Sequence, residues 1–346
     1  MHTLLDSLLT VGHPVVATLV SPVAWERISA VADRLPAPLA RWLYLERRLD
    51  LSDERVDLIV GVERTEARRL AEPGRPFEPM PRGIRRLARA WSTDQRYRSI
   101  ERCWLEYDVL PDGAAPAPGV FLDLEPAAAV LGPAGPFPAV HPGLACLGLP
   151  PDRLRPALQL LARLQGRAPG LLLPYVGYFP DRADAPLRVC LSGVAEDTIA
   201  ALLTDLSWPG EVSRVVTVLA AAGRAPSVIH LDLGPELLPS VGFEFGLDHG
   251  AQLEGRLAEG AWLTEWVRRG WCRPELVAGL CRWPEVTTGV MSHEVWPSLL
   301  VRRVNHLKLV LDAAGRLACK GYLCFTHAPL SAHRPRRAES RQLSIR

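Results

Sequence analysis

Two lysines lie close together near the end of the chain, and they are the only lysines in its 346 residues. Lys308 and Lys320 both fall in the segment NHLKLVLDAAGRLACKGYLCF, residues 305–325, whereas all other basic residues are arginines. The tripeptide Ala-Ala-Gly at 313–315 predicts a hairpin turn with the glycine in the left-handed position. In that register Lys308 lies directly opposite Lys320 on one face of the hairpin.

Two ammonium groups in cross-strand contact repel each other, so a negative group should lie between them. One candidate is the phosphate or diphosphate of a ligand, for which lysine acts as a compact point charge. The other is a carboxylate of the protein itself. The acidic candidates lie on other strand-like segments: Glu106, Asp108, Asp232 and Glu244.

Further groups on the same face can move protons. The hairpin register places His306 opposite Tyr322, and His230 shares a strand-like segment with Asp232. Both histidines are candidate acid–base groups. They have no fixed ligand spacing, so we predict no metal site, and the sequence suggests no cofactor. Glu106 is a candidate general base, with the alternative that it is a solvated carboxylate or a partner of the lysines.

The elements that position these residues recur along the chain. Alternating strand-like segments come in pairs separated by segments with helical spacing. The pairs are 103–109 with 119–126, 171–179 with 186–193, 227–234 with 240–247, and 304–312 with 316–325. Each strand is apolar on one face and polar on the other, which predicts a sheet with one face buried under helices. Before these pairs, residues 1–50 look helical and 56–62 reads as a first strand.

Two architectures fit this pattern. One is an open antiparallel sheet with helices on one face. The other is an antiparallel β-barrel built from repeated αββ units, with helices outside and a polar lumen. We favour the barrel because closure removes exposed strand edges. This α+β fold divides the chain into an N-terminal helical region packed on the barrel (1–100), the barrel domain (101–328) and a disordered basic tail (329–346).

With these features the chain resembles the αββα-repeat prenyltransferases, also called ABBA or PT-barrel enzymes, and in particular the members that prenylate indoles. In that group the barrel begins with a strand bearing a glutamate, followed by a turn and a strand that ends in Glu-Pro. WLEYDV at 104–109 and GVFLDLEP at 119–126 are similar, with Glu106 at the acidic position. Lys320-Gly-Tyr322 and Arg188 resemble parts of the basic and tyrosine signatures on later strands.

The resemblance implies transfer of a prenyl group from an isoprenoid diphosphate to an aromatic or peptide acceptor in bacterial specialised metabolism. Glu106 would take the proton from the acceptor. The residues that would hold the diphosphate are Arg188, Lys308, Lys320, Tyr322 and His306. Other candidates in the lumen are Asp108, His230, Asp232 and Glu244.

The sequence also departs from the group's pattern. The segment at 119–126 has no arginine, and Cys190 stands where a tyrosine is expected, so a diphosphate site would contain few basic residues. An alternative is therefore a non-catalytic barrel, or an open α+β domain, that binds a small molecule or peptide or acts as the partner of a biosynthetic enzyme.

Composition excludes several other classes. The net charge is +2, and the tail with five arginines and one glutamate carries +4, so the remainder carries about −2. That balance argues against a nucleic-acid-binding protein. Seven cysteines without a CxxC motif argue for reduced thiols, and we expect a cytoplasmic location. The sequence predicts neither a signal peptide nor a membrane helix.

Overall fold

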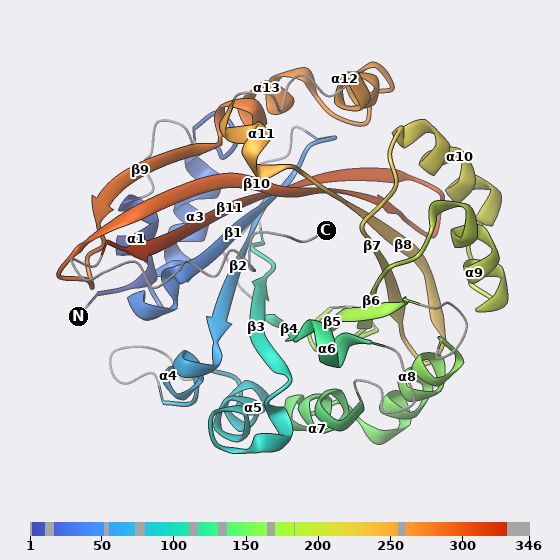
Figure 1. The fold of residues 1–346 in the computed structure, drawn as a ribbon, viewed down its shortest axis with the longest axis horizontal. Coiled ribbons are helices and arrows are strands. Elements are labelled where there is room, and N and C mark those ends of the chain that lie inside the picture. Colours follow the sequence, from blue (N-terminus) through green and yellow to red (C-terminus); the bar gives the residue numbers. More distant parts are fainter. Residues whose placement is uncertain are drawn as a thin grey trace.

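The computed structural model describes residues 2–10, 17–51, 55–72, 80–110, 117–130, 137–164, 170–182, 184–254 and 261–330. In the described part, a single antiparallel sheet runs in the order β11-β1-β2-β3-β4-β5-β6-β7-β8-β10-β9. A further pairing of β10 with β11 closes ten of these strands into a barrel (Figure 1). Strand β9 pairs with the first part of β10 and lies outside the ring.

The strands alternate along the chain with helices. Their bounds are β1 (Trp42–Arg48), β2 (Val56–Glu63), β3 (Ile100–Tyr107), β4 (Gly119–Leu124), β5 (Leu172–Tyr178), β6 (Leu187–Ser192), β7 (Val228–Leu233), β8 (Leu237–Gly246), β9 (Glu285–Val290), β10 (Pro297–Leu311) and β11 (Leu317–Pro329). The sequence prediction of a closed antiparallel barrel is confirmed, and the open sheet is excluded.

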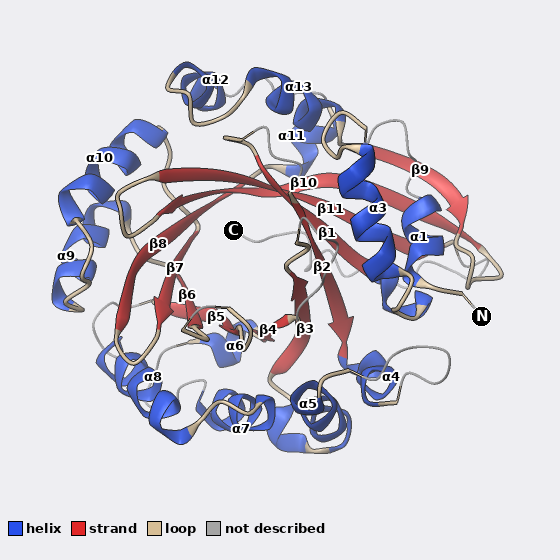
Figure 2. Ribbon diagram, turned by 180° about the vertical axis from the view of Figure 1, so that it is seen from behind, coloured by secondary structure: helices blue, strands red, loops and turns tan. Residues whose placement is uncertain are grey.

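The helices surround the barrel on its outside (Figure 2). They are α1 (Leu4–Thr10), α3 (Pro22–Ala32), α4 (Ala67–Ala71), α5 (Arg82–Thr93), α6 (Pro126–Ala129), α7 (Phe137–Leu147), α8 (Pro151–Leu164), α9 (Ile199–Asp205), α10 (Val212–Ala222), α11 (His249–Leu253), α12 (Ala261–Arg268) and α13 (Pro274–Arg282). Within the described residues, no helix combines the length and the apolar character that crossing a bilayer requires.

Helix α10 illustrates how the sequence builds this outer layer. Its buried residues recur at intervals of three and four, at Val215, Val218, Leu219 and Ala222, so they form one stripe that packs on the barrel. The helix ends at Gly223, whose φ of 71° is the left-handed conformation that glycine adopts without strain. Repetition of such amphipathic helices covers the outer face of the sheet.

The two faces of the strands separate as predicted. The side chains that point outward belong to one large apolar core; among them are Leu105, Val189, Leu231, Phe243 and Leu309. Each of these is fully or almost fully buried. Their neighbours in the sequence point inward and are mostly polar or aromatic, so the lumen is where the chemically active groups gather.

One sequence prediction for the first 50 residues is wrong. We expected helix throughout, whereas Trp42–Arg48 forms β1, which pairs with β11 on one side and β2 on the other. The strand expected at 56–62 is confirmed as β2. Both belong to the same sheet as the later strands. Most of the basic tail, residues 331–346, lies outside the described residues.

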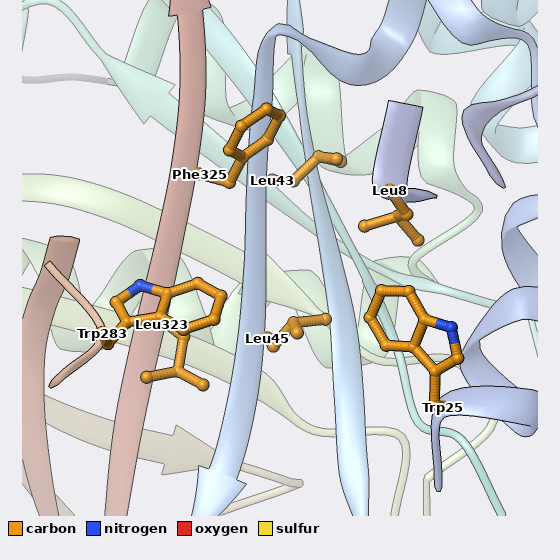
Figure 3. Close-up of a pocket in the computed structure, with 7 residues that line it drawn as sticks. All are labelled: Leu8, Trp25, Leu43, Leu45, Trp283, Leu323 and Phe325. Carbon is orange, nitrogen blue, oxygen red and sulfur yellow. The ribbon is translucent and has the colours of Figure 1, made fainter. Parts of the chain in front are cut away.

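A small cavity marks the outer side of β1 and β11. It has a volume of about 10 Å³ and is lined by apolar side chains from α1, α3, β1, β11 and the end of α13 (Figure 3). That volume corresponds to roughly one water molecule. We interpret it as a packing gap between the N-terminal helices and the barrel wall, and we place the candidate site in the lumen.

The barrel lumen as the candidate functional site

The hairpin of β10 and β11 has the predicted register. Lys308 is the cross-strand partner of Lys320, and His306 is the partner of Tyr322. The turn closes through a hydrogen bond from the Gly315 amide to the Asp312 carbonyl, and Gly315 has a φ of 72°. The two lysines therefore do start from adjacent positions on the lumen face.

Lys320 binds a carboxylate that the sequence did not suggest. Its ammonium group donates a short hydrogen bond to Glu46 on β1, and the Tyr322 hydroxyl donates another to the second oxygen of the same carboxylate. Glu46 is only 3% exposed. Burial alone would raise the pKa of Glu46, but Lys320 and these hydrogen bonds hold it well below its usual value. Glu46 is therefore ionised and firmly paired.

Lys308 points to a different group. Its Nζ lies 3.0 Å from His230 Nδ1 on β7. Because an ammonium can only donate, Nδ1 must accept and the ring proton must be on Nε2. Nε2 in turn lies 2.6 Å from Glu244 Oε1 on β8, and His306 Nε2 lies 3.3 Å from the same oxygen. These four residues form a row of close polar contacts across the lumen.

The pKa values in this chain follow from its burial and charges. Burial and the nearby ammonium group of Lys308 lower the pKa of His230 to about 4, so the ring is neutral at pH 7. Burial and the positive charge of Arg188 lower the pKa of Lys308 to about 8. Burial would raise the pKa of Glu244, but the two histidines hold it well below its usual value.

Arg188 forms a bidentate pair with Asp232. Its Nε and Nη2 lie 2.7 and 2.9 Å from the two carboxylate oxygens, across the β6–β7 pairing. The side chains are 16% and 15% exposed. Burial would raise the pKa of Asp232, but Arg188 lowers it to about 2. Such a planar two-bond pair is among the stronger arrangements for an arginine.

A second arginine of the lumen, Arg182, comes from the connection between β5 and β6. Its Nε and Nη2 each lie 2.7 Å from an oxygen of Asp108, and Nη2 also donates a short hydrogen bond to Glu106. The guanidinium lies 3.8 Å from the centre of the Phe179 ring. Glu106, the candidate base, thus lies in the lumen with one oxygen bound to an arginine.

The charges of this group nearly cancel. The cations are Arg182, Arg188, Lys308 and Lys320. The carboxylates are Glu46, Glu106, Asp108, Asp232 and Glu244. Four positive and five negative charges give 4 − 5 = −1. We refer to these nine residues as the lumen charge cluster.

An aromatic wall lies beside the lumen charge cluster. Its residues form a separate cluster inside the barrel: Trp42, Tyr44, Ile59, Trp104, Phe121, Tyr175, Tyr322 and Cys324. Glycines allow the rings to lie against the strands; a Cβ at Gly177 would be 2.6 Å from Phe121 Cε1. The wall also contains a charge pair, because Arg102 lies between Trp42 and Trp104 and 3.6 Å from Asp123.

Two carboxyl groups in the lumen titrate near neutral pH. Burial raises the pKa of Asp123 to about 7, and the positive charge of Arg102 only partly opposes this. Burial and the negative charge of Glu46 raise the pKa of Asp57 on β2 to about 7. Groups with such values can exchange protons at physiological pH. Neither was among the sequence candidates.

The structure brings all the sequence candidates into one space. Those proposed for a diphosphate and those proposed as additional lumen groups are joined by hydrogen bonds and ion pairs across the barrel. Two further members were missed. Glu46 lies in the segment expected to be helical, and Arg182 lies in a loop, where no periodic pattern marks a residue. None of the four acidic candidates is the partner of Lys320, which pairs with Glu46 instead.

Comparison with known proteins relates the fold to one group. No protein-family model matches the sequence, and no curated protein matches it. Solved structures do match. 5-dimethylallyltryptophan synthase from Streptomyces coelicolor has a TM-score of 0.51 and 16% identity, over 92% of this chain and 97% of that chain.

Two further prenyltransferases give similar values. The apo form of prenyltransferase PriB has a TM-score of 0.52 and 17% identity, over 93% of this chain and 96% of its own. AnaPT from Neosartorya fischeri has a TM-score of 0.50 and 12% identity, over 92% and 90%. Together with the closed ring of ten antiparallel strands, the outer helices and the polar lumen, these matches show that the chain has the ABBA, or PT-barrel, fold of the aromatic prenyltransferases.

Proposed function

We propose that this protein uses the lumen of its PT barrel to bind an aromatic molecule that carries a positive charge, without holding a prenyl diphosphate. The observation that carries the proposal is the lumen charge cluster, in which carboxylates of the protein already neutralise the four cations and leave a net charge of −1. This is the ligand-binding alternative that the sequence left open.

A diphosphate would have to compete with these carboxylates. Removing one partner from a buried ion pair costs about 3–5 kcal/mol. A new hydrogen bond to a charged group contributes about 1.5–3 kcal/mol. For Arg188 and Asp232, which are 16% and 15% exposed, the exchange is therefore unfavourable. Repulsion between the phosphates and the displaced carboxylate adds to the cost.

A cationic aromatic ligand would be attracted by the same carboxylates that repel a diphosphate. Burial and the negative charges of Glu46, Glu106 and Glu244 raise the pKa of Tyr322 well above its usual value, and Glu46 accepts a hydrogen bond from its hydroxyl. A cation is stabilised both by those carboxylates and by the faces of aromatic rings. Lys320 and Arg182 are 25% and 26% exposed, so we infer that a ligand enters from their side.

One of the structurally similar proteins has been solved with a ligand that contains an aromatic ring and an ammonium group. The Streptomyces coelicolor synthase has been solved in complex with DMASPP and Trp, and tryptophan is an aromatic amino acid with a cationic ammonium group. The present lumen has an aromatic wall suited to an aromatic ring that carries an ammonium group, whereas its cations are paired internally. The proposal thus assigns to this chain a ligand of the acceptor class only.

Calorimetry tests the proposal directly. We expect tryptamine to bind to the wild-type protein, and indole, which has the ring without the amine, to bind about tenfold more weakly or worse. Glu244→Gln should weaken tryptamine binding and leave indole binding unchanged. Binding of dimethylallyl diphosphate to the wild-type protein in the absence of an amine would contradict the proposal.

Prenyl transfer is the second candidate, because the fold likeness extends over more than 90% of the chain and Glu106 lies buried in the lumen. In this reading an isoprenoid diphosphate occupies the side of Arg188, Lys308 and Lys320, and Glu106 takes the proton of the acceptor. Incubation with dimethylallyl diphosphate and tryptophan, followed by mass spectrometry, tests it. A product formed by the wild type and lost in Glu106→Gln would establish this candidate. Either activity would serve specialised metabolism.

A further inference from the structure

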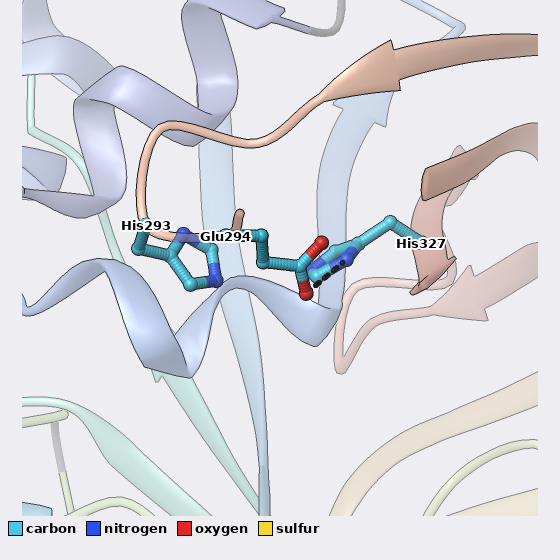
Figure 4. A group of neighbouring side chains, drawn as sticks. All are labelled: His293, Glu294 and His327. Atoms are coloured by element: carbon cyan, nitrogen blue, oxygen red, sulfur yellow. Dashed lines mark ion pairs between the residues drawn. The ribbon is translucent and has the colours of Figure 1, made fainter. Parts of the chain in front are cut away.

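A second group of polar side chains lies outside the barrel, away from the lumen. His293 and Glu294 belong to the connection between β9 and β10, and His327 lies near the end of β11 (Figure 4). One potential ligand atom of each lies within 4.8 Å of the others. His327 is on the same face of β11 as Phe325, which faces the outer core. The two imidazole rings have centroids 5.7 Å apart.

The nitrogens of these histidines lack hydrogen-bond partners. His327 is 5% exposed, yet neither of its ring nitrogens makes a hydrogen bond to the described residues. Nδ1 of His293 is likewise buried and unsatisfied. A buried polar atom without a hydrogen bond costs about 1–3 kcal/mol, and such atoms in a native structure call for an explanation, a bound ion being one. Here the two histidines that carry these atoms lie beside one carboxylate, that of Glu294.

The carboxylate is held in place from behind. Ser298, which is fully buried, donates a short hydrogen bond to Glu294 Oε2. The other oxygen, Oε1, faces His327 Nδ1 at 3.5 Å. A hydrogen bond from the Glu294 amide to the Met291 carbonyl forms the turn that presents His293 and Glu294 together. Support of this kind is typical of the groups that orient metal ligands.

We propose that His293, Glu294 and His327 bind one divalent transition-metal ion, Zn²⁺ by the chemistry of the donors. Two imidazoles and one carboxylate form a set that zinc accepts in proteins, with a fourth position for water. Bonds of about 2.1 Å to tetrahedral zinc place neighbouring ligand atoms about 3.4 Å apart. The pair of Glu294 and His327 is already at 3.5 Å, and rotation of the partly exposed His293 closes the triangle.

The position of the site indicates what the ion does. It joins the β9–β10 connection to the last strand of the barrel. The part of this connection that follows the ligands is exposed, with Val295 and Trp296 at 88% and 60%. The ion would therefore act as a staple on the outer wall of the barrel. It is distinct from the lumen histidines, which both face Glu244.

Zinc binding by the full chain, prepared without a histidine tag, tests the proposal. We expect one Zn²⁺ per chain by elemental analysis after dialysis and a rise in the melting temperature when Zn²⁺ is added. His293→Ala and Glu294→Gln should each weaken Zn²⁺ binding more than tenfold, and Ser298→Ala by about 10–100-fold. His141→Ala, which removes an exposed histidine of α7, should bind Zn²⁺ as the wild type does.

The variants separate ligation from folding. His293 is partly exposed, so His293→Ala should keep the wild-type circular dichroism spectrum even if His327→Ala does not fold. Mg²⁺, which prefers oxygen ligands, should not displace Zn²⁺. Equal zinc content in wild type and His293→Ala, or a wild type that retains no zinc, would overturn the proposal.

Discussion

Lys308 and Lys320 are direct cross-strand partners, and their side chains bind different groups on opposite sides of the hairpin. Lys320 reaches Glu46 on β1, and Lys308 reaches His230 on β7. The repulsion between the ammonium groups is therefore relieved by the protein itself. The negative group expected between them exists as separate partners, Glu46 for one lysine and Glu244, through His230, for the other.

Glu46→Gln is expected to destabilise the fold. It removes the buried charge that accepts hydrogen bonds from Lys320 and Tyr322. We expect the free energy of unfolding to fall by about 1–3 kcal/mol, measured by urea denaturation. Replacing both members of the pair, Glu46→Gln with Lys320→Met, should restore part of that loss. The exposed pair Asp312–Arg316 supplies the control, since Arg316→Gln should change stability by less than about 0.5 kcal/mol.

Asp123→Asn is expected to change the pH dependence of stability. The folded-state pKa of Asp123, about 7, lies above its unfolded value, so its contribution is fully present below about pH 4 and is lost as pH rises through 7. Asparagine keeps the acceptor for Trp104 and does not ionise. As the pH rises from 5 to 8, the free energy of unfolding of the variant should therefore increase relative to that of the wild type, by up to about 3 kcal/mol. Urea titrations at each pH measure this, and parallel curves would refute it.

Acid should act on the paired carboxylates in the opposite sense. The folded-state pKa of Asp232 is about 2, below its unfolded value of about 3.9, and that of Glu244 is also lowered. Their contribution to stability is present above about pH 4 and is lost as pH falls toward 2. The stability of Asp232→Asn should therefore fall less between pH 5 and pH 3 than that of the wild type. Denaturation midpoints at pH 5, 4 and 3 would reveal it.

Gly177→Ala is expected to disturb the aromatic wall. The new Cβ would lie 2.6 Å from Phe121 Cε1, so the ring must move, at a cost of about 1–3 kcal/mol. Gly246→Ala on β8 is the matched control, because its Cβ would meet Ser227 Oγ at an ordinary 3.7 Å. A thermal melt that shows equal losses for the two variants would contradict close packing in the lumen.

Removing two lumen carboxylates is expected to create a diphosphate site. In Asp232→Asn with Glu244→Gln the charge of the lumen cluster becomes 4 − 3 = +1, and Arg188 loses its ionic partner. Calorimetry should then detect binding of dimethylallyl diphosphate that the wild type does not show. The control removes the same kinds of charge from the surface, in Glu196→Gln with Asp197→Asn on η4 (Glu196–Thr198). Binding of dimethylallyl diphosphate by the wild type or by the control would contradict the conclusion that the lumen carboxylates exclude a diphosphate.

The strand faces could be predicted because period-two alternation is a local property of the sequence. It placed Glu106, His230 and Lys308 on the lumen face, and the turn glycine fixed the register of the last hairpin. Strand β1 was missed because its seven residues lie in a region whose spacing suggested helix. Alternation of Trp42 and Tyr44 with Leu43 and Leu45 was the available signal.

The pairing of charges could not be predicted in the same way. Which carboxylate faces which cation depends on the order of strands around the ring, and the position of β1 between β11 and β2 decides it for Lys320. Arg182 reaches the lumen from a connection whose path only the tertiary structure defines. The local sequence pattern thus predicts which residues face the lumen. Which of them form ion pairs with each other depends on the closed barrel.

The closure of β11 on β1 has a consequence for how the chain folds. Glu46 and Lys320 are 274 residues apart in the sequence, so their pair can form only after the whole segment between them has been synthesised. Until then β1 presents an unpaired edge, and Glu46 has neither of the two hydrogen bonds that it accepts from β11. Contacts of such long separation slow folding because loop closure must precede them. Pairing of β11 with β1 is therefore expected to be the final step of barrel assembly. A nascent chain that ends before β11 would be prone to aggregate.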